Sequence, residues 1–158
     1  MLGDWQEDGP ELPLEFARQS ADDRITLVIA DGAQVSRSLW VRLDVRSPED
    51  AIAALARREG TSKTNIGRWP NSGSPENPLI DLISEWAQAR RLDTVVWTAL
   101  PPGMKSQRGV IPDLADLVSH LCALEHDVRD KAAEYVFKAP PQIATRYRER
   151  LQKVLTGS

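Results

Sequence analysis

The sequence has little of what builds secreted or membrane proteins. Its 158 residues include one cysteine, Cys122, so no intrachain disulfide can form and a small disulfide-stapled domain is excluded. No apolar run approaches the roughly 20 residues of a membrane-spanning helix. The N-terminus lacks a basic region followed by an apolar stretch, unlike a signal peptide. We therefore expect a cytoplasmic protein.

Positive charge and metal ligands are also scarce. The formal net charge is −3, which argues against a nucleic-acid binder, because such proteins carry a basic excess or a basic face. The only two histidines, His120 and His126, lack the spacing of metal ligands on one helix face. We expect no metal site and no nucleic-acid partner.

What is present fits one ordinary α+β domain. Hydrophobic residues make up 41% and charged residues 27% of the chain, close to globular averages. A chain of this length favours a single domain over residues 1–158. Strand patterns dominate the first half and helical patterns the second half. Five tryptophans are a generous number, and their ordinary places are the core and pocket walls.

The first 45 residues predict a lead-in and a hairpin. Residues 1–15 hold Gly9, Pro10 and Pro13 among several acids, so we expect them to be irregular. Residues 25–30 are rich in β-branched side chains and predict a strand. Asp31 and Gly32 form a favoured turn pair. Residues 38–45 alternate between apolar and polar side chains, which predicts the second strand of a β-hairpin.

A helix is predicted from Pro48 to about residue 58. Ser47 can cap its N-terminus, Pro48 suits the first helical position, and Asp50 occupies the capping-box position. Gly60 supplies the stop.

The rest of the chain predicts two loops, a strand and helices. We expect polar loops at 61–76 and 101–112, and long loops in compact domains usually serve function or motion. The apolar run 94–100 predicts a central strand buried on both faces. Apolar stripes predict helices at 77–91, 113–121, 126–138 and 143–155.

Glu59 is the candidate catalytic residue. Ile52, Leu55 and Glu59 share one helix face, and that face is apolar. An acid there conflicts with the pattern, and the last helical turn also disfavours negative charge. Such conflicts often mark functional sites, and a half-buried carboxylate suits a general base or acid near neutral pH. The alternative is that Glu59 turns to solvent and pairs with Arg57, Arg58 or Lys63.

Three stretches, at 14–28, 39–43 and 55–60, resemble the gamma-glutamylcyclotransferase-like family. In that family a strand, a short helix and an acid–glycine pair occur in this order, and the acid is the catalytic glutamate. Glu59 and Gly60, in Leu-Ala-Arg-Arg-Glu-Gly, match that pair. The resemblance covers about residues 12–62.

The resemblance implies a fold and a reaction. The fold is a small mixed β-sheet or barrel with flanking helices. In the reaction, the free α-amine of a gamma-glutamyl amine or peptide attacks its own γ-amide carbonyl and releases 5-oxoproline. Glu59 would take the amine proton and return it to the leaving group, with no metal or organic cofactor.

The chain departs from the family at one important motif. The family carries a Tyr-Gly-Ser-Leu-type loop whose backbone amides hold the substrate, but Tyr135 and Tyr147 lie in no such motif. Either the N-terminus is shortened or the protein is a non-catalytic binding or protein-interaction module on the same fold. A missing first strand would leave an open sheet edge for a protein partner or a homodimer.

Other candidates are weighed against plain structural roles. Trp69 and Trp97 are candidate walls of a substrate pocket, with core packing as the alternative. Arg68 is a candidate ligand for a substrate carboxylate, with solvent exposure as the alternative. We expect Cys122 to be a buried structural thiol. The basic residues near the C-terminus predict a solvated helix face or an anion or partner site: Arg146, Arg148, Arg150 and Lys153.

Overall fold

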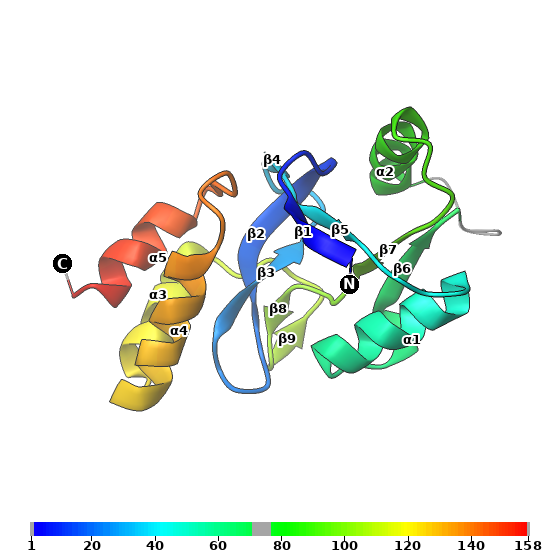
Figure 1. Ribbon diagram of the computed structural model, residues 1–158. Helices are drawn as coiled ribbons and strands as arrows, with labels where there is room; N and C mark the ends of the chain where they lie inside the picture. The colour runs from blue at the N-terminus through cyan, green and yellow to red at the C-terminus, as the bar shows by residue number, and fades with distance from the viewer. Residues whose placement is uncertain (1, 71–76, 158) are drawn as a thin grey trace. The chain divides into compact units, whose positions relative to one another are not determined.

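The computed structural model describes the backbone of residues 2–70 and 77–157, and it has an α+β fold (Figure 1). Its strands are β1 (Leu2–Gln6), β2 (Glu11–Gln19), β3 (Ile25–Ile29), β4 (Val35–Arg37), β5 (Trp40–Arg42), β6 (Ile66–Trp69), β7 (Val95–Thr98), β8 (Gly103–Met104) and β9 (Gln107–Arg108). Its helices are α1 (Pro48–Glu59), the short 3-10 helix η1 (Lys63–Asn65), α2 (Pro78–Ala89), α3 (Leu114–Ala123), α4 (His126–Lys138) and α5 (Arg148–Leu155). No helix in the described ranges is long and apolar enough to cross a membrane.

The chain forms two compact units, each built from two separate segments. Unit 1 comprises Met1–Leu12 and Arg37–Leu100, and unit 2 comprises Pro13–Ser36 and Pro101–Ser158. The expectation of one domain over the whole chain stays a prediction.

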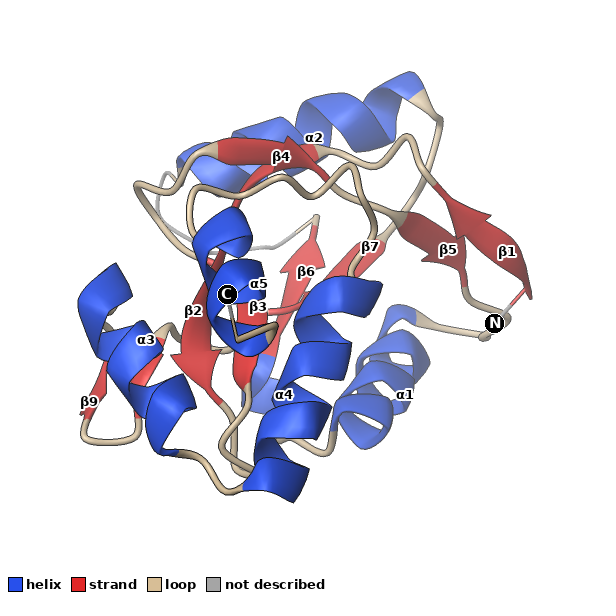
Figure 2. Cartoon of the chain, turned by 90° about the vertical axis from the view of Figure 1, so that its left-hand side faces the viewer, coloured by secondary structure: helices blue, strands red, loops and turns tan. Residues whose placement is uncertain are grey.

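Unit 1 contains two antiparallel strand pairs and two helices. β1 pairs with β5, and β6 pairs with β7. Helix α1 packs against β6 and β7, while α2 contacts β6. The two helices lie on opposite sides of the β6–β7 ribbon (Figures 1 and 2). Its buried apolar residues include Ala51, Ala56, Ile66, Ile83 and Trp86.

Local signals fix the ends of α1 where they were predicted. The Ser47 hydroxyl accepts a hydrogen bond from the backbone N–H of Asp50 at 3.1 Å. Pro48 occupies the first turn, where a missing N–H is harmless. Gly60 ends the helix with φ +62°, a left-handed conformation that glycine adopts without a Cβ penalty.

Unit 2 is built around β2. β2 pairs antiparallel with β3 and parallel with β8, and β4 also pairs with it. Helices α3, α4 and α5 pack against one another, and α4 contacts β3 (Figure 2). The core of this unit has a small apolar cluster of Ala17, Val28 and Ala30 and a larger one: Phe16, Ile25, Leu117, Leu121, Ala132, Val136, Leu151 and Val154.

The fold class, a mixed sheet with flanking helices, is confirmed, but several strand predictions are wrong. Residues 1–15 are not irregular, because β1 and the start of β2 lie there. The expected hairpin does not form, since β3 pairs with β2 and β5 pairs with β1. The turn at Asp31 and Gly32 does form. Strand pairing depends on distant segments that local patterns do not report.

The two predicted loops contain secondary structure. The segment 61–76 holds η1 and β6, and its part 71–76 lies outside the described residues. The segment 101–112 holds β8 and β9. β7 is half-buried rather than buried on both faces, and within the described chain it pairs with β6 alone. Its apolar side chains instead line a groove.

Candidate functional site

All five tryptophans of the chain belong to unit 1. Trp5, Trp40, Trp86 and Trp97 line one groove of about 590 Å³, which we call the tryptophan groove. A volume of this size is typical of sites that hold small molecules or short peptide segments. Aromatic walls offer much apolar surface, so the groove can bury the apolar body of a ligand.

The groove runs along the edges of two strands. Side chains of a strand point alternately to opposite faces, so a pocket on one face contacts every second residue. The tryptophan groove instead contacts every residue of 38–43 and of 92–97. It therefore follows the backbone edges of β5 and β7, and the two helices of unit 1 close its sides. Helix α1 contributes Ala51, Leu55 and Arg58, and α2 contributes Ile83 and Trp86.

Asp8 holds two of the indoles in place. The indole N–H of Trp40 donates to its Oδ1 at 2.7 Å, and that of Trp86 donates to its backbone carbonyl at 2.7 Å. Arg90 donates to Oδ2 at 2.7 Å and lies over the Trp86 ring. The two rings meet edge to face, with centroids 5.3 Å apart. The hydrogen bonds from Trp40 and Arg90 lower the pKa of the Asp8 carboxyl.

Arginines dominate the charge of the groove. Its charged lining residues are Arg42, Arg46, Arg58 and Asp93. The guanidinium of Arg42 lies 5.5 Å from the centroid of Trp40, and that of Arg58 lies 5.2 Å from the centroid of Trp5. Stacking on an indole orders a guanidinium, and that of Arg58 also faces the carboxylate of Glu59. The lining therefore favours an anionic group beside an apolar one.

Trp97 reaches the groove because its cross-strand neighbour is a glycine. Gly67 lies opposite Trp97 in the β6–β7 register. A Cβ on Gly67 would overlap Cε2 and Nε1 of Trp97, so the indole lies directly over the glycine backbone. The strand position of Gly67 thus makes room for one wall of the site.

Glu59 does not have the half-buried position that its helix face predicted. Its side chain is 37% exposed, and its Oε1 lies 3.6 Å from Nε of Arg58. The groove-lining residues do not include it. The buried face of α1 is centred on Ala51 and Ala56 instead, so the last turn extends beyond the packed part of the helix. The alternative orientation, toward solvent and Arg58, is the one observed.

The other three predicted site residues lie on β6 and β7 but do not form one site. Trp97 lines the groove, as a pocket wall would. Trp69 is half-buried and is not among the lining residues. Arg68 alternates to the other face of the ribbon, where its Nη1 pairs with Glu49 of α1 at 3.2 Å. Arg68 is therefore committed to an ion pair with α1.

Two expectations about unit 2 are wrong. Cys122 is exposed rather than buried. Arg148 is not on a solvated face, because it is 8% exposed and its guanidinium donates to backbone carbonyls at the end of α4 and just beyond it. Burial lowers the pKa of Arg148. The carbonyls at a helix C-terminus attract cations, so this arginine ties α5 to α4.

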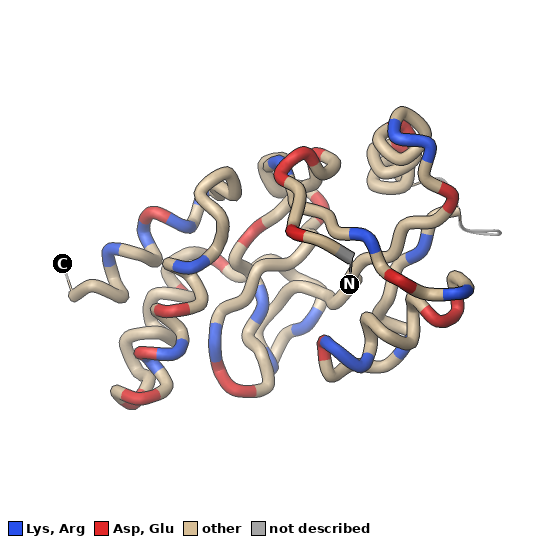
Figure 3. The backbone as a smooth tube through the Cα atoms, in the orientation of Figure 1, with Lys and Arg blue, Asp and Glu red and all other residues tan. Residues whose placement is uncertain are grey.

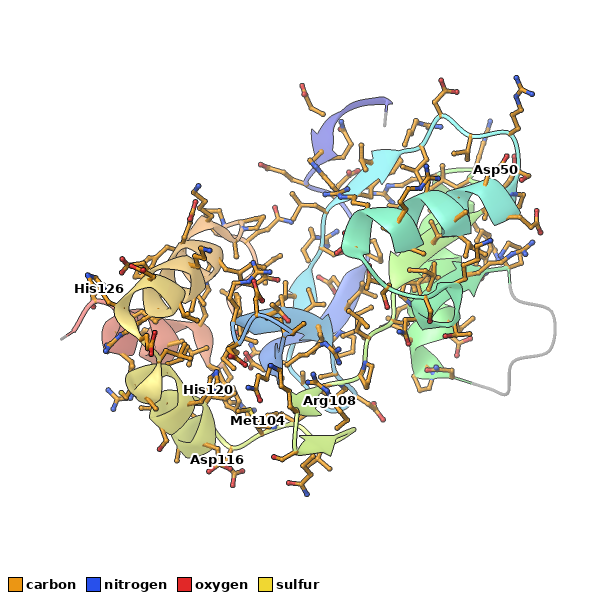
Figure 4. All side chains as sticks on the ribbon, turned by 90° about the horizontal axis from the view of Figure 1, so that it is seen from below. Asp50, Met104, Arg108, Asp116, His120 and His126 are labelled. Atoms are coloured by element: carbon orange, nitrogen blue, oxygen red, sulfur yellow. The ribbon has the colours of Figure 1, made fainter. Side chains whose placement is uncertain are left out.

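The histidines do not converge on a metal site. His120 Nε2 lies 2.8 Å from the backbone carbonyl of Asp23, whereas His126 starts the next helix (Figure 4). Across residues 2–70 and 77–157, no group of three or more His, Cys, Asp or Glu side chains is placed to hold a metal ion.

Unit 2 has a second, more polar hollow of about 680 Å³ between β3 and α4. Its charges pair locally: Arg24 with Asp22 at 2.8 Å, and Lys138 with Glu134. Figure 3 shows acidic and basic segments interspersed in each unit. The tryptophan groove, which is lined by four indoles and three arginines, is the stronger candidate for a ligand with an apolar body.

Comparison with known proteins gives no relative for this chain. No family model, no curated protein and no solved structure matches it. The resemblance to the gamma-glutamylcyclotransferase-like family therefore stays a prediction.

Sequence reasoning missed most of the groove. Trp5, Trp40 and Trp86 come from three distant segments, and only the number of tryptophans hinted at a shared site. The alternation in 38–45 indicated a half-exposed strand but not what its edge would face.

Proposed function

We propose that the protein is a non-catalytic binding module whose tryptophan groove captures a ligand with an apolar body and a negatively charged group. The observation that supports this most is one groove of about 590 Å³ lined by four indoles and three arginines, two of which lie over Trp40 and Trp5. The indoles supply apolar contact area, and the arginines supply charge complementarity.

The geometry of the walls favours binding because part of the site is already ordered. Trp40 and Trp86 are held by Asp8, and Trp97 lies over Gly67. A ligand therefore loses little free energy to the ordering of these side chains. Each 100 Å² of apolar surface that it buries contributes roughly 2.5 kcal/mol before the cost of association.

The charge requirement can be tested with two dyes of similar shape. Anilinonaphthalene sulfonate carries a negative charge, and N-phenylnaphthylamine is its neutral counterpart. We expect saturable binding of the sulfonate to the folded protein, quenching of tryptophan fluorescence, and weaker binding of the neutral dye. A retained near-ultraviolet circular dichroism spectrum excludes dye binding to a partly unfolded state.

A matched pair of variants tests whether the groove is the site. Arg46 lines the groove and Lys63 does not, and both are exposed in unit 1. Arg46→Glu should weaken sulfonate binding about fivefold, equal to roughly 1 kcal/mol for an exposed charge, while Lys63→Glu should leave it unchanged. Equal effects of both variants, or no saturable binding to the wild type, would contradict the proposal.

Cyclisation of a gamma-glutamyl compound is the second candidate function. Its support is the family-like order of motifs and the position of Glu59, which directly follows the groove-lining Arg58. Incubation with gamma-glutamyl peptides and measurement of 5-oxoproline tests it. Release by the wild type and its loss in Glu59→Gln would establish the enzyme and overturn the non-catalytic proposal. Equal release by both proteins would remove Glu59 from the mechanism.

A further inference from the structure

The two strands that border the tryptophan groove each have an edge without a strand partner. Within the described chain, β7 pairs with β6 alone and β5 pairs with β1 alone. An unpaired edge presents a row of backbone N–H and C=O groups that can pair with another strand. In unit 1, β5 and β7 lie next to each other in both ribbon views, with β1 and β6 on their outer sides (Figures 1 and 2).

The groove contacts consecutive residues of both strands, so these edges face into it. We infer that it accepts an extended peptide of apolar residues flanked by acidic ones, which pairs with β5 and β7 and completes a sheet in the order β1–β5–peptide–β7–β6. This inference rests on the proposed binding function and names the ligand class.

The size of the groove fits a short strand. A residue in a strand occupies about 3.3 Å along the chain, about 4.8 Å between strands and about 10 Å between packed layers, or about 160 Å³. The groove of about 590 Å³ therefore holds about four residues. β7 is itself four residues long, so its edge matches the length of such a segment.

The helices determine which side chains the peptide needs. Helix α1 lies on one side of the β6–β7 ribbon and α2 on the other, and both contribute lining residues. An inserted strand is thus covered on both faces, as in a buried parallel sheet, and its central side chains should all be apolar. Arg42 and Arg46 are exposed, lie at and after the C-terminal end of β5, and should meet a carboxylate at that end of the segment.

Backbone pairing can be tested with N-methylated peptides. The probe is a fluorescein-labelled Asp-Val-Ala-Val-Ala-Glu peptide, and its control replaces both acids with lysine. Successive N–H groups of a strand point to opposite edges, so methylating the valine amides blocks one edge and methylating the alanine amides blocks the other. We expect each methylated set to weaken binding about tenfold by fluorescence anisotropy, and the lysine peptide to bind more weakly than the acidic one.

The outcomes separate this inference from the proposed function. If the sulfonate dye binds but the peptide does not, strand insertion is overturned and the binding groove remains. The same holds if both methylated sets of peptides bind as tightly as the unmethylated peptide. If methylation weakens peptide binding in only one of the two sets, insertion between two strand edges is also overturned. Size exclusion with light scattering tests whether a second copy of the chain occupies the groove. A concentration-dependent dimer that no longer binds the dye would show this and overturn the peptide assignment.

A pair of valine variants locates the peptide. Val45 is 38% exposed in the groove, and Val110 is 50% exposed in unit 2. Neither side chain is buried, so both substitutions by glutamate should leave the protein folded. Val45→Glu should weaken binding of the acidic peptide at least fivefold, and Val110→Glu should leave its affinity unchanged. Equal affinities of the two variants would overturn the assignment.

Discussion

Replacing Gly67 with alanine is expected to displace Trp97 from the groove. A Cβ at this position would overlap Cε2 of the indole, so the bulky ring would have to shift. Overpacking of this kind typically costs about 1–3 kcal/mol. The added methyl group also restricts the unfolded chain, which alone would stabilise the protein by roughly 0.4–1 kcal/mol. We therefore expect a net loss of about 1–2 kcal/mol in the free energy of unfolding.

The interpretation is tested by repeating the substitution without the indole. In a Trp97→Ala background the three atoms nearest to the new methyl group are absent, so Gly67→Ala should become neutral or slightly stabilising. Urea unfolding followed by circular dichroism gives both values, provided that the slope m is the same in all four proteins. An equal cost of Gly67→Ala with and without Trp97 would show that the indole is not what the methyl group displaces. The single variant should also bind the sulfonate dye more weakly than the wild type.

Three further predictions concern other parts of the chain. Asp8→Asn removes the ion pair with Arg90 and weakens the hydrogen bond from the Trp40 indole, while the bond from Trp86 to the backbone carbonyl remains; we expect weaker dye binding. The folded-state pKa of the Asp8 carboxyl is below its ordinary value of 3.8, so the ionised carboxylate stabilises the folded state above that pH. This stabilisation is lost as the pH falls through the folded-state pKa. Unfolding measured at a series of acidic pH values should show the loss in the wild type and not in Asp8→Asn. Ser47→Ala removes the cap of α1 and should cost about 1 kcal/mol in urea unfolding. Arg148→Met leaves carbonyls at the end of α4 without their donors and should cost roughly 2–4 kcal/mol in the same assay; a cost near zero would show that the buried guanidinium is dispensable.

The helices could be predicted from sequence because their signals are local. Ser47, Pro48 and Gly60 act within one helical turn of the end that they fix, and their prediction is confirmed. Residues 1–15 were instead predicted to be irregular, because Gly9 and Pro10 are typical loop residues. They become part of a strand-rich region only because distant segments supply partners: the Gly9 N–H bonds the Ser38 carbonyl at 3.0 Å.

The candidate site could be predicted only in fragments. Trp97 was a candidate pocket wall because it lies near the end of a predicted central strand, and it lines the groove, but the opposite wall comes from segments more than 50 positions earlier in the chain. Glu59 followed the expected helical spacing, yet spacing does not reveal how far along a helix the packed surface extends. The packing of α1 ends near Ala56, and this limit depends on β6 and β7 rather than on the helix itself.

Four of the five tryptophans line one groove, and they should therefore respond together to one ligand. Each indole N–H gives its own signal in a two-dimensional nitrogen–proton NMR spectrum, and single Trp→Phe variants assign the signals. On titration with anilinonaphthalene sulfonate, the signals of Trp5, Trp40, Trp86 and Trp97 should shift together with one dissociation constant, while that of Trp69 should stay in place. Shifts confined to a single indole, or spread equally over all five, would contradict the account.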